Sequence, residues 1–283
     1  MRLTRRGRLA ATVTSLGLLV ALVAYLLLRT PVGTALGLTT GPPCTLSLGD
    51  DTLEWSREQA MTATTVAGVG TRIGASVNGV AEAVARSLEP EPEAALPVEA
   101  ARQVYRSMPD TATPDPQAVH VAQSLLGHHG GALACVLPFT DSVSDGPGET
   151  PGELGLTPRA DGMRLAMRSV FGKQALGGFD PEGVDSGHME GSAHYEGRAI
   201  DVFFRPVTPE NQRLGWQQAN WSVAHADRLD LATVIFDARI WSARRSIEGW
   251  RDYIYPGGTD NPVLLHEDHV HVDVVATGPP AAS

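Results

Sequence analysis

The stretch AIDVFF at residues 199–204 alternates in the manner of a β-strand and encloses one carboxylate, Asp201. It is followed by TPENQRLGWQQANWSVAHADRL at 207–228, whose Thr-Pro-Glu start is typical of a helix. LATVIFDARIW at 231–241 is again strand-like, as is HVHVDVV at 269–275. Strands interleaved with one long helix predict an α+β fold, with a sheet that carries helices on one side.

A separate domain is predicted upstream of this sheet. Residues 141–154 (DSVSDGPGETPGEL) are rich in Gly, Pro, Ser and acidic residues, which is typical of a linker. We therefore place a small helical domain at 44–137, a linker at 138–157 and the sheet domain at 158–276. In the first domain, residues 56–80 are rich in Ala, Thr and Val, and the stretches 97–108 and 115–126 have helix-like apolar spacing after a Pro or Asp start.

The N-terminus carries the most apolar segment of the chain. Residues 9–28, LAATVTSLGLLVALVAYLLL, hold twenty residues without a charge, long enough at about 1.5 Å per residue to cross a bilayer core of about 30 Å. Arginines in the tail 1–8 favour a cytoplasmic N-terminus. We therefore expect a transmembrane anchor and a single-pass cell-membrane protein whose bulk is extracellular. A cleaved signal peptide is the alternative.

The charge of the chain and its two cysteines indicate which partners and which cellular compartment to expect. The 283 residues include 22 Lys and Arg against 32 Asp and Glu, a formal charge of −10. Such acidity repels phosphate backbones, so no nucleic-acid partner is expected. Cys44 and Cys135 lie in the part expected outside the reducing cytoplasm, which predicts a disulfide between them. Two free buried thiols are the alternative.

Histidines cluster in two short motifs, SAHYEGRAID at 192–201 and HEDHVHVD at 266–273. Side chains alternate faces along a strand, so His269, His271 and Asp273 are expected to share one face. Two histidines and one carboxylate with an open fourth position are typical of a catalytic zinc site, which would hydrolyse an amide. The alternative is that the histidines only hydrogen-bond across the sheet.

These motifs resemble those of the zinc metallopeptidases that include D-alanyl-D-alanine carboxypeptidases, the penicillin-insensitive murein endopeptidase, lysostaphin-type enzymes and the hedgehog domain. The pattern S-x-H-x2-G-x-A-x-D is present from Ser192 to Asp201, and the resemblance covers about 159–275. It implies an antiparallel sheet with flanking helices. It also implies three sets of site residues: zinc ligands His194, Asp201 and His271; catalytic histidines His266 and His269; and supporting residues Ser192, Gly197 and Asp273.

The helical segment weakly resembles the degenerate lysozyme-like domain of some secreted actinobacterial wall proteins, through Gln59-Ala60 and ALAC at 132–135. No glutamate in it lies in a recognisable transglycosylase motif. Together the two resemblances imply a membrane-anchored actinobacterial wall protein with peptidoglycan peptide as its substrate.

Two positions differ from the carboxypeptidases. Asp268 stands where they carry a catalytic Glu, and its expected direction away from His271 favours a base assisted by histidine. Asp180 occupies the loop that supplies a carboxylate-binding arginine in those enzymes, and Arg168 or Arg205 are candidates to replace it. The sequence thus predicts a zinc-dependent carboxypeptidase or endopeptidase of peptidoglycan. The alternative is a noncatalytic, zinc-retaining wall-binding or scaffolding protein.

Overall fold

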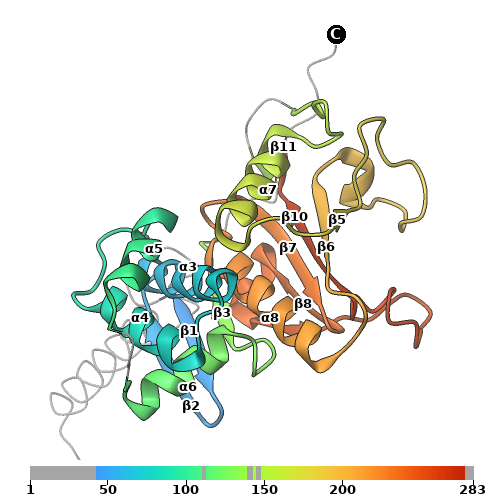
Figure 1. The fold of residues 1–283 in the computed structure, drawn as a ribbon. Helices are drawn as coiled ribbons and strands as arrows, with labels where there is room; N and C mark the ends of the chain where they lie inside the picture. Colours follow the sequence, from blue (N-terminus) through green and yellow to red (C-terminus); the bar gives the residue numbers. More distant parts are fainter. Residues whose placement is uncertain (1–42, 110–112, 139–142, 145–147, 278–283) are drawn as a thin grey trace, which may run out of the picture.

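The structure is a computed structural model that describes residues 43–109, 113–138, 143–144 and 148–277 (Figure 1). Its first part contains β1 (Cys44–Leu48), β2 (Asp51–Trp55), α3 (Arg57–Ile73), α4 (Val77–Leu88), α5 (Val98–Ser107), α6 (Pro116–Leu125), β3 (Leu133–Cys135) and β4 (Val143–Ser144). Its second part contains α7 (Pro158–Phe171), β5 (Leu176–Gly177), the 3-10 turn η1 (Ala193–Glu196), β6 (Ala199–Phe203), α8 (Pro209–Ala224), β7 (Leu231–Phe236), β8 (Arg239–Ser242), the 3-10 turn η2 (Ala243–Glu248), β9 (Arg251–Asp252), β10 (His269–Val274) and β11 (Ala276–Thr277).

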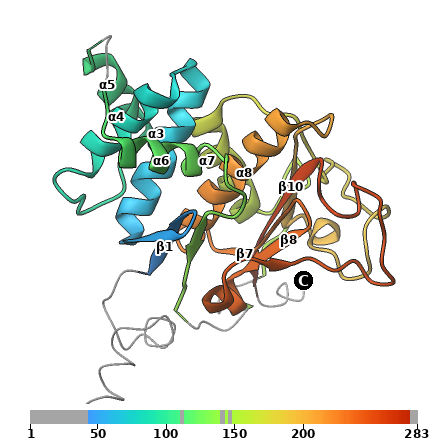
Figure 2. The ribbon, with the colours of Figure 1, turned by 90° about the horizontal axis from the view of Figure 1, so that it is seen from below.

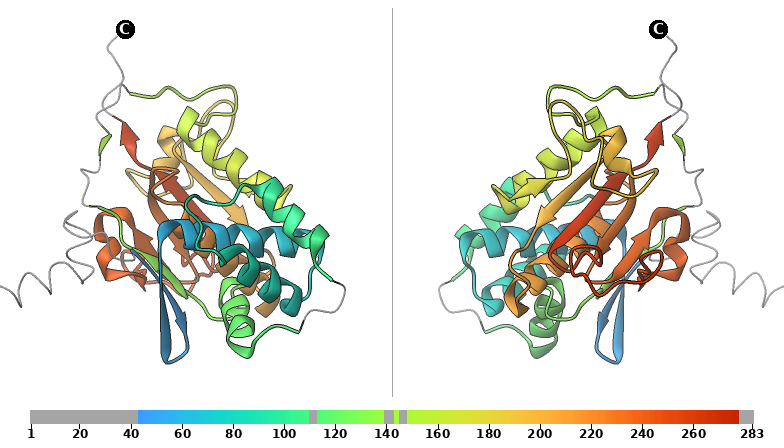
Figure 3. Two further views of the ribbon diagram at one scale, coloured as in Figure 1. Left: turned by 90° about the vertical axis from the view of Figure 1, so that its left-hand side faces the viewer. Right: turned by 90° about the vertical axis from the view of Figure 1, so that its right-hand side faces the viewer.

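An antiparallel six-stranded sheet in the order β5-β6-β10-β7-β8-β9 forms the frame of the second part. β10 lies at its centre, with His271 opposite Asp201 of β6 and Ile235 of β7. Helices α7 and α8 pack on one face (Figures 1 and 3). Val270 and Val272 are buried in the core on the helix side. The alternate residues of β10 therefore face the other side of the sheet.

The segment 231–241, expected to be one strand, is a hairpin. β7 and β8 pair antiparallel across a turn at Asp237 and Ala238, whose φ angles are +52° and +53°. Two successive residues with positive φ are what a two-residue hairpin turn requires. The prediction of a single strand was wrong because Asp-Ala lacks the glycine that normally marks such a turn.

Helix α3 is the central helix of the first part. Ser56 and Gln59 cap each other's backbone N–H groups at its start. α3 packs against α4, α5 and α6 as well as α7 and α8, so its middle is buried on all sides (Figure 2). A Cβ added at Gly68 would collide with Val170 and one at Gly70 with Tyr105. These glycines allow the close helix packing.

The sequence predicted a purely helical first domain, but the first part of the structure also contains a β-sheet. β1 pairs with β2 and β3 to form a three-stranded antiparallel sheet. Its strands of three to five residues are too short for the alternation to separate them from loops. The predicted disulfide is confirmed: Cys44 and Cys135 are bonded and lie opposite each other on β1 and β3.

The predicted single-pass membrane topology requires correction. Within residues 43–277, apart from the gaps given above, no helix is both long enough and apolar enough to cross a bilayer. Over these described residues the fold class is α+β, without the transmembrane helix that was part of the prediction, and they contain no support for the predicted cell-membrane localisation. The stretch 9–28, on which both predictions depended, lies outside the described residues.

Candidate metal centre

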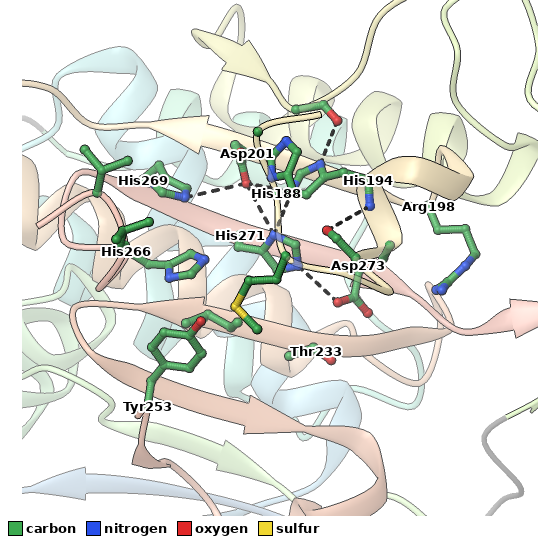
Figure 4. A pocket seen from close by; sticks show the side chains of 18 of the residues that line it. His188, His194, Arg198, Asp201, Thr233, Tyr253, His266, His269, His271 and Asp273 are labelled. Atoms are coloured by element: carbon green, nitrogen blue, oxygen red, sulfur yellow. Dashed lines mark hydrogen bonds and ion pairs between the residues drawn. The ribbon is translucent and has the colours of Figure 1, made fainter. Parts of the chain in front are cut away.

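A pocket of about 850 Å³ opens on the face of the large sheet opposite to α8. β6, β7 and β10 supply its floor, and loops around residues 187–194 and 253–266 supply its walls (Figure 4). The ligand and catalytic histidines expected from the sequence all line it, together with Asp201 and Asp273. His188, which the sequence analysis did not assign, lines it as well.

Three ligand atoms form a compact triangle at the centre of the pocket. His194 Nε2 lies 3.0 Å from His271 Nδ1, and each of these nitrogens lies 3.3 Å from Asp201 Oδ1. Donors held about 2.0–2.1 Å from one tetrahedral ion lie about 3.3 Å apart. The spacing of this triangle therefore fits a zinc ion held by His194, Asp201 and His271.

Hydrogen bonds on the outer side fix the tautomers of both histidines. His194 Nδ1 lies 2.6 Å from the Gly178 carbonyl oxygen, and His271 Nε2 lies 3.1 Å from Asp273 Oδ2. Both partners are acceptors, so these nitrogens carry the protons. The inner nitrogens of two neutral imidazoles then direct lone pairs toward each other and toward a carboxylate. Such an arrangement needs a cation or a proton between the donors.

The local electrostatics favour a cation at this point. Burial would raise the pKa of Asp201, but hydrogen bonds and charge from His194 and His271, when these rings are protonated on the inner side, hold it well below its usual range. Burial would lower the pKa of His271, yet Asp201 and Asp273 raise it to about 9. Two ionised carboxylates beside one imidazole thus stabilise positive charge, from a proton or from a metal ion.

A second, overlapping group of donors is formed by His188, His194 and Asp201, whose ligand atoms all lie within 4.8 Å of one another. The rings of His188 and His194 are stacked, with centroids 3.9 Å apart and planes 21° from parallel. Imidazole lone pairs lie in the ring plane, so these two run along nearly parallel lines. The triangle with His271 therefore fits a shared ion better, and His188 is a further donor beside it.

His269 is held by an acidic partner outside the pocket. Its Nδ1–H donates to Asp268 Oδ1 at 2.7 Å, so its Nε2 carries the lone pair and lies 3.7 Å from Asp201 Oδ1. Asp268 also accepts from Arg205, whose guanidinium lies 4.1 Å from the centroid of the Phe203 ring. Asp268 is absent from the pocket lining, in agreement with its expected direction away from His271.

His266 lies against the other two histidines of its motif. Its ring centroid is 4.7 Å from that of His269 and 5.7 Å from that of His271. Burial lowers its pKa to about 3, so the ring is neutral near pH 7. The hairpin turn that the sequence did not predict holds this loop, because Asp237 N–H donates to the His266 carbonyl at 2.9 Å.

The supporting residues act mainly on the turn that carries His194. The Ser192 side chain accepts from the His194 backbone N–H, and Gly197 ends η1 with a φ of +65°. The Gly197 carbonyl accepts from Thr157 N–H at 2.9 Å, which ties the turn to the start of α7. Asp273 supports the other histidine ligand, because it accepts a hydrogen bond from His271 Nε2–H.

Other contributors were missed or left open by the sequence analysis. Gly178 holds the His194 tautomer through its carbonyl, and His188 stacks on the same ring. Neither lies in a periodic pattern. His188 stands six positions before His194, so in the sequence it is only an additional histidine in a Gly-rich loop. Of the two candidate arginines, Arg205 lines the pocket and Arg168 does not.

Part of the chain matches a known family model. Residues 152–262 match the family model described as "VldE, C-terminal domain". No curated protein and no solved structure matches the chain significantly. The match spans well under half of the chain: it includes His194 and Asp201 but ends before the 266–273 motif.

Proposed function

We propose that this protein is a zinc-dependent peptidase acting on the peptides of peptidoglycan. The observation that carries the proposal is the triangle of His194, Asp201 and His271, with both imidazole lone pairs directed inward. The resemblance of the two motifs to murein peptidases supplies the substrate class. The large, open pocket on the sheet is consistent with an extended peptide chain.

The arginines of the pocket favour an endopeptidase over a carboxypeptidase. Among the described lining residues these are Arg198 and Arg205. Arg198 pairs with Glu196 and donates to the Val274 carbonyl, while Arg205 pairs with Asp268. Each guanidinium thus already has an acceptor within the protein. An endopeptidase binds its substrate in the middle of the peptide chain, where there is no free carboxylate, so neither arginine is needed to pair with the substrate.

The chemistry that zinc supplies at such a site is the polarisation of a carbonyl and the activation of water near neutral pH. Its ligands here would be His194, Asp201 and His271. Asp273 keeps the proton on His271 Nε2, so Nδ1 stays available as a donor atom. The Gly178 carbonyl does the same for His194 through Nδ1.

His269 is placed to act as the base. Its Nε2 faces the pocket with a free lone pair, and Asp268 stabilises the imidazolium that forms when this nitrogen accepts a proton. The proton comes from the water that adds to the amide carbon, and its transfer to the leaving amine accompanies the breaking of the C–N bond. Neutral His266, packed against the ring of His269, can donate one N–H to negative charge that develops on the substrate oxygen.

The test uses the full chain with four variants and two readouts. Zinc per chain is measured by mass spectrometry, and release of soluble peptides from purified peptidoglycan is measured on the same samples. We expect His194→Ala and His271→Ala to lose zinc and cleavage together, and His269→Ala to keep most zinc and lose cleavage. His129→Ala, an exposed histidine outside the pocket, is the matched control and should change neither.

The contrary outcomes are specific. Full cleavage by His271→Ala protein would refute the ligand assignment. Stoichiometric zinc in wild-type protein without release of any peptide would reject the peptidase and favour a noncatalytic wall-binding protein. Absence of zinc from wild-type protein would reject the metal centre itself.

A further inference from the structure

We propose that His188 is a fourth, displaceable protein ligand at the same metal position, so that the site is closed by the protein until substrate enters. The proposal rests on the metal-binding part of the proposed function and not on peptide cleavage. Three donors, His194, Asp201 and His271, leave one position of a tetrahedral site open. His188 is the nearest further histidine to His194, as the stacked rings show.

The distances place His188 close to the shared position. Two donors on one tetrahedral zinc ion lie about 3.3 Å apart. The ligand atoms of His188, His194 and Asp201 lie within 4.8 Å of one another. The difference is at most about 1.5 Å, which a turn of the half-buried His188 ring out of its stack can remove.

The backbone of His188 is fixed although its side chain is half-exposed. The Tyr195 hydroxyl accepts from His188 N–H at 3.0 Å and donates to the His188 carbonyl. Tyr195 lies in η1, directly after His194. The same short turn therefore carries the ligand His194 and, through Tyr195, holds the backbone of His188 in place.

The chain on either side of His188 is shaped by glycine. Gly187 and Gly191 have φ angles of +87° and +75°, and a Cβ added at either would meet nothing within 4 Å. These glycines are therefore needed for the positive φ angles of the loop and not for close packing. The loop lines the pocket through His188 and Met189, so a substrate that fills the pocket must contact it.

Closure by His188 has a chemical consequence. A site with four protein donors resembles a structural site, whereas catalysis needs one exchangeable position. Substrate or another oxygen ligand must therefore compete with His188. Loss of the imidazole should weaken metal binding and at the same time ease access for such a ligand.

The experiment uses metal alone as the first probe. Zinc dissociation constants of wild type, His188→Ala and Ser186→Ala are measured by competition with a chromophoric chelator, and cobalt(II) spectra are recorded for each. We expect His188→Ala to raise the dissociation constant at least about tenfold and to weaken the visible cobalt bands as water replaces a nitrogen donor. Ser186→Ala, two residues before His188 in the same loop and outside the pocket lining, should match wild type.

A second probe tests displacement. Acetohydroxamic acid, which binds metals through oxygen, is titrated into the cobalt-loaded proteins. His188→Ala should reach its half-maximal spectral change at a lower concentration than wild type. Tyr195→Phe, which removes the hydrogen bonds to the His188 backbone but keeps the ring, should shift both readouts in the same direction by a smaller amount and remains informative if His188→Ala does not fold.

Either of two results would overturn the proposal. One is wild-type zinc affinity and cobalt spectrum in folded His188→Ala protein. The other is weaker metal binding with an unchanged hydroxamic acid titration, which would make His188 a fixed ligand. Neither readout requires hydrolysis, so a protein that binds metal as described but cleaves no peptide would refute the proposed peptidase alone.

Discussion

Each ligand histidine is fixed in one tautomer by an acceptor on the side away from the pocket. For His271 this acceptor is a carboxylate two residues along the same strand, Asp273. For His194 it is the backbone carbonyl of Gly178, sixteen residues earlier in the chain. Gly178 has a φ of +76°, and a Cβ at this position would collide with the His194 ring. The residue is therefore required both for its backbone conformation and for its lack of a side chain.

Replacement of Gly178 by alanine should displace His194 and weaken metal binding at least about tenfold, because the ring loses both its space and its hydrogen bond. Gly183→Ala is the matched control: its φ of +85° carries the same backbone penalty, about 1 kcal/mol, but an added Cβ meets nothing within 4 Å. Zinc competition and urea unfolding of both variants separate the two effects. Equal zinc affinity in the two would contradict the role assigned to Gly178.

At the scale of elements, helix α8 joins the sheet to the helical part. Thr208 caps its start by accepting from Asn211 N–H. His225, the residue that follows its last turn, is buried against α3: Nδ1–H donates to the Trp221 carbonyl at 2.9 Å, and Nε2 accepts from the Thr65 hydroxyl at 3.3 Å. Burial lowers the pKa of His225 to about 4, with Arg228 acting in the same direction. The folded protein therefore keeps this histidine neutral.

This burial predicts a loss of stability in acid. In the unfolded chain His225 binds a proton below about pH 6.5, whereas the folded protein resists protonation down to about pH 4. The stabilising contribution is complete above pH 6.5 and is lost as the pH falls through 4, which amounts to about 3 kcal/mol. Urea unfolding at pH 7 and pH 4.5 should show a smaller fall for His225→Gln than for wild type. An equal fall in both would contradict the prediction, and His120→Gln, exposed on α6, is the control.

At the scale of the whole molecule, the two parts of the chain share one hydrophobic core. β3 is one of the places where they meet. The indole N–H groups of Trp241 and Trp250 donate to the carbonyls of Cys135 and Leu133, at 3.3 Å and 2.9 Å. Leu137 N–H donates to Ser246 Oγ at 2.9 Å. The strand that carries one half of the disulfide is thus bonded to the far edge of the large sheet.

Loss of the disulfide should therefore destabilise the whole described fold and not only the small sheet. It closes a segment of 91 residues, worth about 4 kcal/mol in the chain-entropy view. The double variant Cys44→Ala/Cys135→Ala should show a lower melting temperature, seen equally by tryptophan fluorescence and far-UV circular dichroism. Reductant should lower the melting temperature of wild type to that of the variant and leave the variant unchanged. Loss of only part of the signal would show that the two parts unfold independently.

The sequence alone determined what local pattern carries: the strand around Asp201, the long helix after it, the shared face of His269, His271 and Asp273, and the pairing of two cysteines. These follow from periodicity and from the cost of burying an unpaired carboxylate.

Only the tertiary structure decided which groups hold those residues in place. The Gly178 carbonyl, the stacked His188, the Asp268–Arg205 pair and the hairpin turn behind His266 reach the site from separate segments. Their contacts arise when β5, β6 and β10 come together in one sheet. Local spacing cannot encode such contacts, because they depend on which strands become neighbours and not on distance along the chain.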